Sequence, residues 1–328
     1  MKQLEYLAPT EVADAVAAVA GDSQAQFLAG GTNLVDHLKL GVCTPDTLID
    51  VRKLPLHDVE ETDAGLRIGA NVTNSDLAAH PAVRAGWPAV ARALLAGASP
   101  QIRNQATTGG NLLQRTRCVY FQDVTTACNK REPGSGCSAI GGYERHNAVL
   151  GASDACVAAH PSDLAVALTA LDADVIALGP TGRRHLPVAD LHRLPGEHPD
   201  KDTVLEHGEL ITAVDLPATQ LARNSTYVKV RDRASFAFAL VSVAAALRME
   251  DGLIAEIALA WGGVAHTPWR ATRAEAALLG QQVTEDNIAA AVDAELQDAQ
   301  FSADTAYKRP MLRGATVSAL LQLRGEEN

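Results

Sequence analysis

The chain has 328 residues, of which 47% are hydrophobic and 4% aromatic, a length that allows one large domain or two ordinary ones. Its 39 acidic residues outnumber its 28 lysines and arginines, which gives a net charge of −11. Such a surface repels nucleic-acid phosphates and anionic lipids, so we expect no nucleic-acid partner. The longest apolar run, residues 236–247, is too short to cross about 30 Å of hydrocarbon, so we expect no membrane insertion.

The first third of the chain alternates helical and strand patterns. A helix is predicted over residues 10–20, with Thr10 as its N-cap and Gly21 as its end. Short apolar segments predict strands at residues 25–29, 47–51 and 66–70, and a helix at 81–96 follows. This order of elements predicts an α+β fold.

Residues 114–156 have no sustained hydrophobic period and contain several glycines and four cysteines. A structureless segment of this length is uncommon inside a compact domain unless a function or a bound group organises it. We therefore interpret residues 114–156 as an insertion that folds around a ligand.

Regular patterns resume after the insertion. A helix with Pro161 in its first turn is predicted at 161–171, with strands near 174–178, 183–188 and 209–216. A polar break at 217–224 separates a first domain, residues 1–217, from a second, residues 224–328. The second domain shows three strand-like runs at 225–231, 236–249 and 253–262, with an Asp-Gly hairpin signal before the third, and helical patterns near 270–280, 284–296 and 305–323. It is predicted to be an antiparallel sheet covered by helices.

Two glycine pairs follow apolar segments. The first lies in the sequence LAGGTNLV, residues 28–35, and the second in TTGGNL, residues 107–112. Adjacent glycines let the backbone turn sharply and present bare N–H groups, and a helix start beyond them favours an anion such as pyrophosphate. One such pair indicates only a tight turn, whereas two similar loops favour one extended dinucleotide. Neither a G-x-G-x-x-G nor a P-loop pattern is present.

Five cysteines give an odd number, so complete disulfide pairing within the chain is impossible. Four of them, Cys118, Cys128, Cys137 and Cys156, lie in or at the end of the insertion, and Cys43 lies apart. Four thiolates can hold a zinc ion or one iron–sulfur cluster. The absence of a short C-x₂₋₄-C pair favours the cluster, while zinc and unrelated buried thiols remain alternatives. Lys229, in the strand YVKVR, must find an anion or reach solvent, and surface exposure is the simpler interpretation.

The motifs LAGGTNLVDHLKL, QIRNQATTGGNLLQRTRC, PSDLAVAL and ELITAVDLP resemble the FAD-binding medium subunit of the xanthine dehydrogenase and molybdenum-dependent aldehyde oxidoreductase family. The resemblance extends over essentially the whole chain. It implies a two-subdomain FAD-binding domain of the vanillyl-alcohol-oxidase-like (PCMH) type, followed by a domain like that of carbon monoxide dehydrogenase flavoproteins. The cysteine-rich run resembles the bacterial periplasmic aldehyde oxidoreductase subgroup, whose flavin subunit also holds a [4Fe-4S] cluster.

The resemblance also implies roles for individual residues. Leu28, Ala29, Gly30, Gly31, Thr32, Asn33 and Leu34 would wrap the FAD pyrophosphate, and Thr108, Gly109, Gly110 and Asn111 would line the other side of the cofactor. Asp163 would anchor the flavin half, Ile211 would pack near the adenine or its linker, and Lys229 would lie close to the flavin. Cys118, Cys128, Cys137 and Cys156 would be the cluster ligands.

The implied function is electron transfer. A large partner subunit would oxidise the aldehyde at a molybdenum cofactor, a small partner would carry [2Fe-2S] clusters, and FAD on this chain would pass the electrons to an external acceptor. No catalytic residue is expected on this chain. Two alternatives remain, a self-contained flavin oxidoreductase with a structural zinc site, and a subunit of an enzyme like hydroxybenzoyl-CoA reductase; a non-catalytic metal-stabilised scaffold is a third.

The N-terminal segment bears on where the protein is located. Glu5, Glu11 and Asp14 interrupt the N-terminal segment, which therefore lacks the apolar core of a signal peptide. We expect the chain to reach the periplasm by co-export with a signal-bearing partner, or to stay in the cytoplasm.

Overall fold

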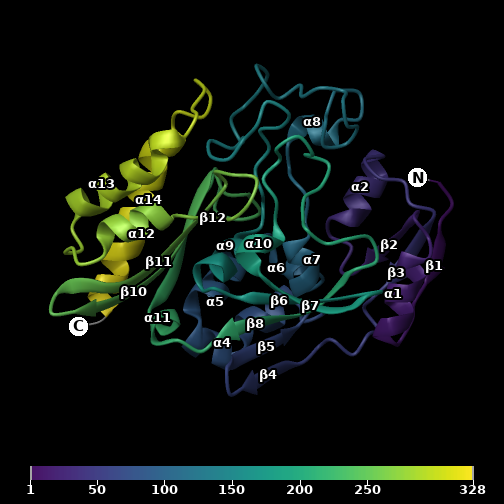
Figure 1. The fold of residues 1–328 in the computed structure, drawn as a ribbon, viewed down its shortest axis with the longest axis horizontal. Coiled ribbons are helices and arrows are strands. Elements are labelled where there is room, and N and C mark those ends of the chain that lie inside the picture. The colour runs from purple at the N-terminus through teal and green to yellow at the C-terminus, as the bar shows by residue number, and fades with distance from the viewer. Residues whose placement is uncertain (1, 327–328) are drawn as a thin grey trace.

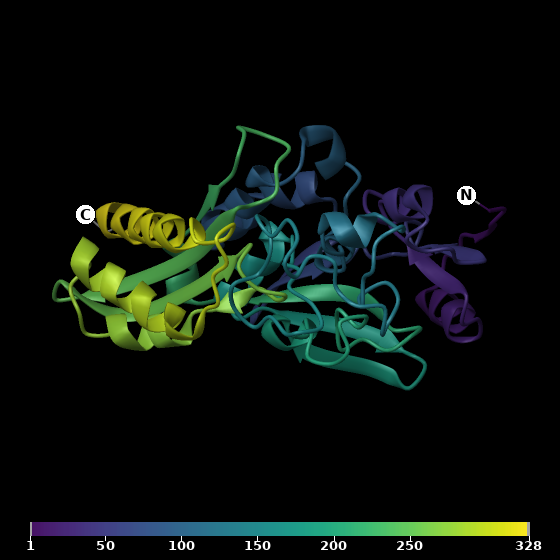
Figure 2. The same ribbon diagram turned by 90° about the horizontal axis from the view of Figure 1, so that it is seen from above.

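The computed structural model describes residues 2–326 and contains three β-sheets with helices packed on their faces (Figure 1). The sheets follow one another along the molecule, so that the N-terminal and C-terminal sheets lie at opposite ends (Figure 2). The predicted α+β class, with a C-terminal antiparallel sheet covered by helices, is confirmed. No helix within residues 2–326 is both long and apolar enough to span a bilayer.

The N-terminal sheet is parallel and has the order β1-β3-β2. Its strands and helices are β1 (Glu5–Leu7), α1 (Val12–Ala20), β2 (Ala25–Leu28), α2 (Leu34–Leu40) and β3 (Thr47–Asp50). Ala15, Val16 and Val19 form the buried face of α1, because residues three and four apart share one side of a helix. This small core fixes the end of β2, from which the first glycine loop emerges.

The middle sheet is antiparallel and has the order β4-β5-β8-β6-β7. Its strands are β4 (Val59–Thr62), β5 (Gly65–Gly69), β6 (Asp174–Gly179), β7 (Gly182–Pro187) and β8 (Leu210–Pro217). The helices of this part are α3 (Asn74–Ala79), α4 (Pro81–Gly86), α5 (Pro88–Ala96), α6 (Pro100–Arg103), α7 (Thr108–Leu112), α9 (Asp163–Ala170), α10 (Val188–Leu191) and α11 (Gln220–Arg223). Helix α9 has no polar face, since it packs between α5 on one side and strands of the third sheet on the other.

The C-terminal sheet is antiparallel and has the order β12-β11-β10-β9. Its elements are β9 (Ser225–Val230), β10 (Val241–Glu250), β11 (Leu253–Gly262), β12 (Trp269–Arg270), α12 (Thr272–Leu278), α13 (Glu285–Glu295), the 3₁₀ turn Leu296–Asp298 and α14 (Lys308–Glu326). The predicted Asp-Gly hairpin joins β10 to β11, and both Asp251 and Gly252 have positive φ angles.

Strand β10 separates two hydrophobic cores. Ala244 and Ala246 belong to the core of the middle part, whereas Val243, Ala245 and Leu247 belong to the core under α12–α14. Successive side chains of a strand point to opposite faces, and here both faces are covered. The long apolar run in the sequence therefore reflects a strand that is buried on both sides.

Residues 114–156 form the expected irregular insertion. Its single helix among the described residues is α8 (Val119–Gln122), and the rest consists of turns and short bridges above the middle of the molecule in Figure 1.

Two of the predicted elements begin or end elsewhere in the structure. The helix predicted at 81–96 is broken at Trp87, because Pro88 disfavours a helical conformation in the residue before it and supplies no N–H. The strand predicted from residue 236 begins at Val241, because residues 231–240 form a loop in which Phe236 has a positive φ angle of 50°.

Two predicted helix starts are wrong. Thr10 does not cap α1, whose N-cap position is occupied by Glu11 without a side-chain hydrogen bond. Pro161 precedes α9 rather than joining its first turn. Ser162 caps that helix, because its hydroxyl oxygen accepts a hydrogen bond from the Ala165 N–H.

Candidate FAD and metal sites

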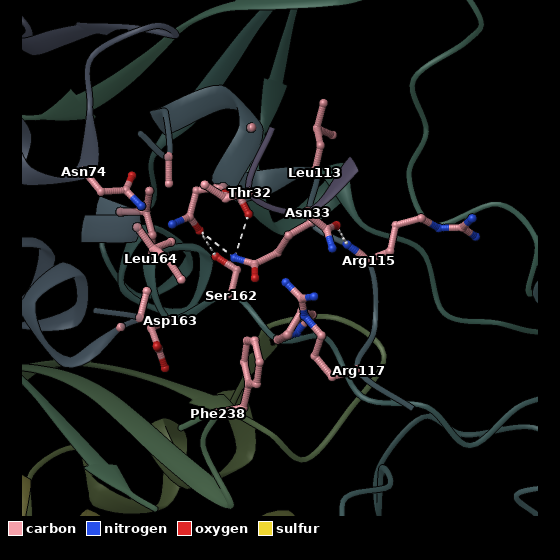
Figure 3. Close-up of a pocket in the computed structure, with 18 of the residues that line it drawn as sticks. Thr32, Asn33, Asn74, Leu113, Arg115, Arg117, Ser162, Asp163, Leu164 and Phe238 are labelled. Atoms are coloured by element: carbon pink, nitrogen blue, oxygen red, sulfur yellow. Dashed lines mark hydrogen bonds between the residues drawn. The ribbon is translucent and has the colours of Figure 1, made fainter. Parts of the chain in front are cut away.

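A cavity of about 850 Å³ lies where the N-terminal part, the middle part, the insertion and the C-terminal domain meet. This volume is within the range of pockets that hold ligands of cofactor size. Figure 3 shows side chains from all these parts around it, among them Thr32, Asn33, Arg117, Asp163 and Phe238. The cavity brings together most of the residues that the sequence predicted to bind FAD.

The first glycine loop turns from β2 into α2 along one wall of the cavity. Gly31 has a φ angle of 73°, which favours glycine, and the first backbone hydrogen bond of the turn runs from Val35 N–H to Gly31 O. A Cβ atom on Gly30 would lie 1.9 Å from Gln105 O, so only glycine permits this close contact between two backbones. The N–H groups at the start of the turn have no intrahelical partner and are available to a ligand.

The second glycine pair lies in the short helix α7, next to the first loop. Thr107 caps α7 by accepting the Gly110 N–H, and Gly109 N–H donates to Ala70 O. A Cβ atom on Gly110 would lie 3.6 Å from the Cβ of Ala29, so the two glycine segments are direct neighbours. They form one continuous strip of bare backbone in the cavity wall.

Two of the predicted FAD ligands do not line the cavity. Leu28 ends β2 and pairs with Asp50 of β3, and Thr108 is fully buried with its hydroxyl donating to Val72 O. The remaining twelve predicted positions are in the cavity wall, as follows: Ala29, Gly30, Gly31, Thr32, Asn33, Leu34, Gly109, Gly110, Asn111, Asp163, Ile211 and Lys229. Ile211 is buried in β8 and lies next to Gly109, where a Cβ atom on the glycine would be 3.6 Å from the Cβ of Ile211.

A hydrogen-bond network at the C-terminal end of α7 was not predicted. Asn111 Oδ1 accepts hydrogen bonds from the Ser162 hydroxyl at 2.6 Å and from Gln114 Nε2 at 3.0 Å (Figure 3). Because Ser162 also caps α9, this network fixes α7 against α9. The sequence could have predicted the capping role of Ser162, because a serine directly before a helical pattern is a typical N-cap.

Asp163 and Lys229 form a buried ion pair at the cavity wall. Lys229 Nζ lies 2.7 Å from Asp163 Oδ2, and the hydroxyl of Tyr227 donates to Asp163 Oδ1 at 2.6 Å. Burial and the adjacent carboxylate raise the pKa of Tyr227 well above its ordinary value. The simpler interpretation of Lys229 as a surface residue is wrong, since its side chain is 3% exposed.

The four insertion cysteines lie near one another. Cys128 and Cys137 face each other in an antiparallel bridge, and the Cys156 thiol donates a hydrogen bond to the Cys137 sulfur. The pKa of Cys118 is raised, chiefly by burial and further by the neighbouring Cys128 and Cys137. Cys43 lies outside this group, and all five cysteines are free thiols.

Backbone N–H groups point at three of the four sulfurs. The donors belong to Tyr120 and Phe121 for Cys118, to Ala139, Ile140 and Val157 for Cys137, and to Ala158 for Cys156. The Cys156 hydrogen bond, together with these N–H groups, lowers the pKa of Cys137 to about 6. The pKa of Cys156 is raised, because its proton is held by the Cys137 sulfur and because it is buried. Residues 2–326 contain no group of three or more His, Cys, Asp or Glu side chains that could hold a metal ion as they are arranged here.

The insertion is fixed to the rest of the chain by a shared carboxylate. Asp202 pairs with Arg115 and with Lys130, whose side chain is 1% exposed and also donates to Pro199 O. Burial alone would raise the pKa of Asp202, but Arg115 and Lys130 lower it to about 2. Cys118 itself lines the cavity, so the predicted cluster ligands begin at the cavity wall.

Comparison with known proteins gives concordant results. The family model for the FAD binding domain in molybdopterin dehydrogenase matches residues 2–219, and that for the CO dehydrogenase flavoprotein C-terminal domain matches residues 226–323. The chain is 48% identical to the aldehyde oxidoreductase FAD-binding subunit PaoB of Escherichia coli, over 99% of this chain and 100% of that one. It is 26% identical to the glyceraldehyde dehydrogenase medium chain of Sulfolobus acidocaldarius, over 98% of each.

Solved structures agree with these sequence matches. Carbon monoxide dehydrogenase from Hydrogenophaga pseudoflava aligns with a TM-score of 0.76 and 28% identity, over 97% of this chain and 96% of that one. The chain therefore belongs to the FAD-binding medium-subunit family of the molybdenum-dependent CO, xanthine and aldehyde dehydrogenases.

Proposed function

We propose that this chain is the FAD-binding, electron-transferring subunit of a molybdenum-dependent aldehyde oxidoreductase. The observation that carries the proposal is the cavity, in which two glycine segments and the Asp163–Lys229 pair converge. The 48% identity to an aldehyde oxidoreductase FAD-binding subunit, over the full length of both chains, supports aldehydes as the substrate class of the complex.

The residues of the cavity fit FAD. The first glycine loop offers backbone N–H groups without intrahelical partners for the two phosphates. The N–H groups of Gly109 and Gly110 already donate within the chain, so these glycines contribute a wall without side chains. Asn111, fixed by Ser162 and Gln114, presents a polar group beside the glycine strip. FAD bound here would accept two electrons from the partner centres and pass them on to an external acceptor.

The chain's own residues would bind and orient the cofactor. The first glycine loop would hold the pyrophosphate, and Ile211 would give an apolar surface beside it. Asp163 and Lys229, which connect α9 to β9, would keep the C-terminal domain closed over the flavin half and exclude water from it. None of these roles requires a general acid or base on this chain for the oxidation of the aldehyde.

We further propose that Cys118, Cys128, Cys137 and Cys156 hold a [4Fe-4S] cluster. Two observations support this assignment. The four thiols lie close enough to influence one another, and backbone N–H groups point at three of the sulfurs, an arrangement that stabilises negative charge on cluster ligands. The cluster would lie beside the FAD cavity, because Cys118 contributes to its wall.

In the proposed enzyme this chain works with two partners. A large subunit would carry the molybdenum cofactor and a small subunit the [2Fe-2S] clusters, in a heterotrimer. The support is membership of a family whose members include medium chains of glyceraldehyde and carbon monoxide dehydrogenases.

One purification tests these proposals. The complex is purified through a tag on this chain, its subunits are identified, and FAD, iron, zinc and molybdenum are quantified per complex. Flavin absorption bands with a broad shoulder and four iron atoms beyond those of the [2Fe-2S] clusters are expected. Zinc in place of that iron would contradict the cluster, and a complex without flavin would contradict the function.

The cysteine ligands are tested by paired substitutions. Cys137→Ser is expected to remove the iron of this chain, because serine is a poor ligand for an iron–sulfur cluster. Cys43→Ser is the matched control and should retain the full iron content, since Cys43 lies outside the group of four. Equal iron content in the Cys137→Ser variant and the unmodified complex would overturn the assignment.

A further inference from the structure

One of the cations that line the FAD cavity has no hydrogen-bond acceptor among the described residues. Five lysine and arginine side chains line the cavity: Arg103, Arg115, Arg117, Lys229 and Arg233. Four of them donate to a carboxylate or carbonyl oxygen within the described chain. Arg117 does not, and its Nε atom is buried with no acceptor among the described residues.

The guanidinium of Arg117 is nevertheless held in place. Its Cζ atom lies 4.8 Å from the ring centre of Phe238, a residue of the loop before β10. Figure 3 shows the Arg117 guanidinium pointing into the pocket beside Phe238, whereas the side chain of Arg115 extends away from it. The stacked ring orients the cation but provides no negative charge to balance it.

A partly buried guanidinium without an anion is unfavourable. The buried Nε atom of Arg117 has no acceptor among the described residues, and the carboxylate of Asp36, which also lines the cavity, makes no ion pair with it. Buried charges in proteins are normally paired, so an arginine that points into a ligand cavity indicates that the ligand carries the anion. Arg115 and Lys229 are already paired with carboxylates, and Arg103 and Arg233 donate to carbonyl oxygens. Of these five cations, Arg117 is the one whose buried Nε atom remains free for a ligand.

We propose that Arg117 is a cofactor-binding residue that stabilises negative charge on the bound FAD. The inference rests on the proposed binding of FAD in this cavity. Two parts of FAD carry the required charge, the pyrophosphate and the flavin ring, which becomes more negative when it is reduced. Because Arg117 directly precedes Cys118, the cysteine-rich insertion itself supplies this residue to the FAD site.

The test compares Arg117→Gln with the unmodified enzyme in the purified complex. FAD per complex is quantified, and the midpoint potential of the flavin is measured by spectroelectrochemical titration. If Arg117 faces the flavin ring, reduced FAD should bind about tenfold less tightly relative to oxidised FAD, which lowers a two-electron midpoint potential by about 30 mV. If Arg117 faces the pyrophosphate, FAD content should fall at least tenfold while the potential of the retained flavin stays unchanged.

Two further variants make the comparison specific. Arg117→Lys keeps the charge and is expected to recover part of either effect. Arg309→Gln is the matched control, because Arg309 also stacks on a phenylalanine, Phe301, with the same 4.8 Å from its Cζ atom to the ring centre, but neither residue lines the cavity. The control should keep both FAD content and flavin potential.

Each outcome decides the inference. Unchanged FAD content and unchanged potential in Arg117→Gln would overturn it and leave the proposed function intact. An unmodified complex without FAD would overturn the proposed function and this inference together. Should Arg117→Gln fail to assemble, Phe238→Leu at the half-exposed partner removes the stacking support instead, and an unchanged potential and FAD content in that variant would overturn the inference.

Discussion

Lys229 Nζ lies 2.7 Å from Asp163 Oδ2, and this ion pair connects β9 of the C-terminal sheet to the first turn of α9. The side chains are 3% and 10% exposed. Each partner makes an additional hydrogen bond, from Tyr227 to Asp163 and from Lys229 to Ala96 O. The pair therefore meets the condition under which a buried ion pair is tolerated, which is that its remaining polar groups are also satisfied.

Replacing Asp163 by Asn should destabilise the protein by about 3–5 kcal/mol, because it leaves the Lys229 ammonium buried without a counter-charge. Thermal release of flavin from the complex is the measurement. Asp215→Asn is the control, since its partner Arg67 lies 2.7 Å away with both side chains about a third exposed, and less than about 1 kcal/mol is expected. Equal effects of the two substitutions would contradict a special role for the buried pair.

Gly30→Ala should weaken FAD binding and destabilise the protein by about 1–3 kcal/mol, because the new Cβ would lie 1.9 Å from Gln105 O and force the two loops apart. Equilibrium dialysis against FAD and thermal unfolding measure the two effects. Gly86→Ala provides the comparison, since a Cβ at the end of α4 meets no atom within 4 Å. That substitution should leave FAD affinity unchanged.

Stability should fall as the pH drops below about 6.5, because several histidines are buried in the neutral form. Burial lowers the pKa of His37 to about 4 and that of His266 to about 3, so the unfolded chain binds more protons than the folded one between these values and 6.5. At pH 5.5 each such histidine reduces the free energy of unfolding by about 1.4 kcal/mol relative to pH 8. Urea unfolding at several pH values measures this dependence.

The contribution of His37 can be separated by substitution. His37→Gln should reduce the loss of unfolding free energy between pH 8 and pH 5.5 by about 1.4 kcal/mol. His185→Gln, on the exposed face of β7, is the control and should not reduce this loss. The same slope in the His37→Gln variant and the unmodified protein would show that His37 does not contribute.

Asp202→Asn should loosen the insertion, because Asp202 neutralises both Arg115 and the buried Lys130. A loss of about 3–5 kcal/mol is expected, as for other interrupted buried pairs. The rate at which a chelator removes the iron of the proposed cluster should rise in this variant. Asp298→Asn, which breaks an exposed pair with Arg273, should not change that rate.

The sequence was sufficient to predict the parts of the fold that depend on local pattern. The hairpin at Asp251–Gly252 and the apolar runs of β10 and β11 follow from turn chemistry and burial, and the structure confirms them. Pro88 could have predicted the break at Trp87, but the apolar residues on both sides of it keep a helical spacing, which favoured one continuous helix. Local patterns therefore predicted the elements better than their ends.

The cavity residues were predictable only where they lie in short motifs. Gly30 and Gly110 share such motifs, and the structure brings both into one wall. Arg117 and Phe238 are 121 positions apart, and nothing local indicates that their side chains stack. Leu28 was included because of its motif neighbours, yet its backbone pairs with β3 and its side chain stays outside the cavity wall.

The two ends of the cysteine-rich insertion lie side by side, since the Thr116 hydroxyl donates to Ala159 O at 3.0 Å. A short connection between these positions would bridge the gap and leave α7 and α9 where they are. The cysteine-rich segment is thus a module inserted at a single point, and a protein engineer can remove or transplant it as one piece. By the same geometry, a chain without the segment could keep both glycine loops in place, and gaining the segment would add Arg117 and Cys118 to the cavity wall.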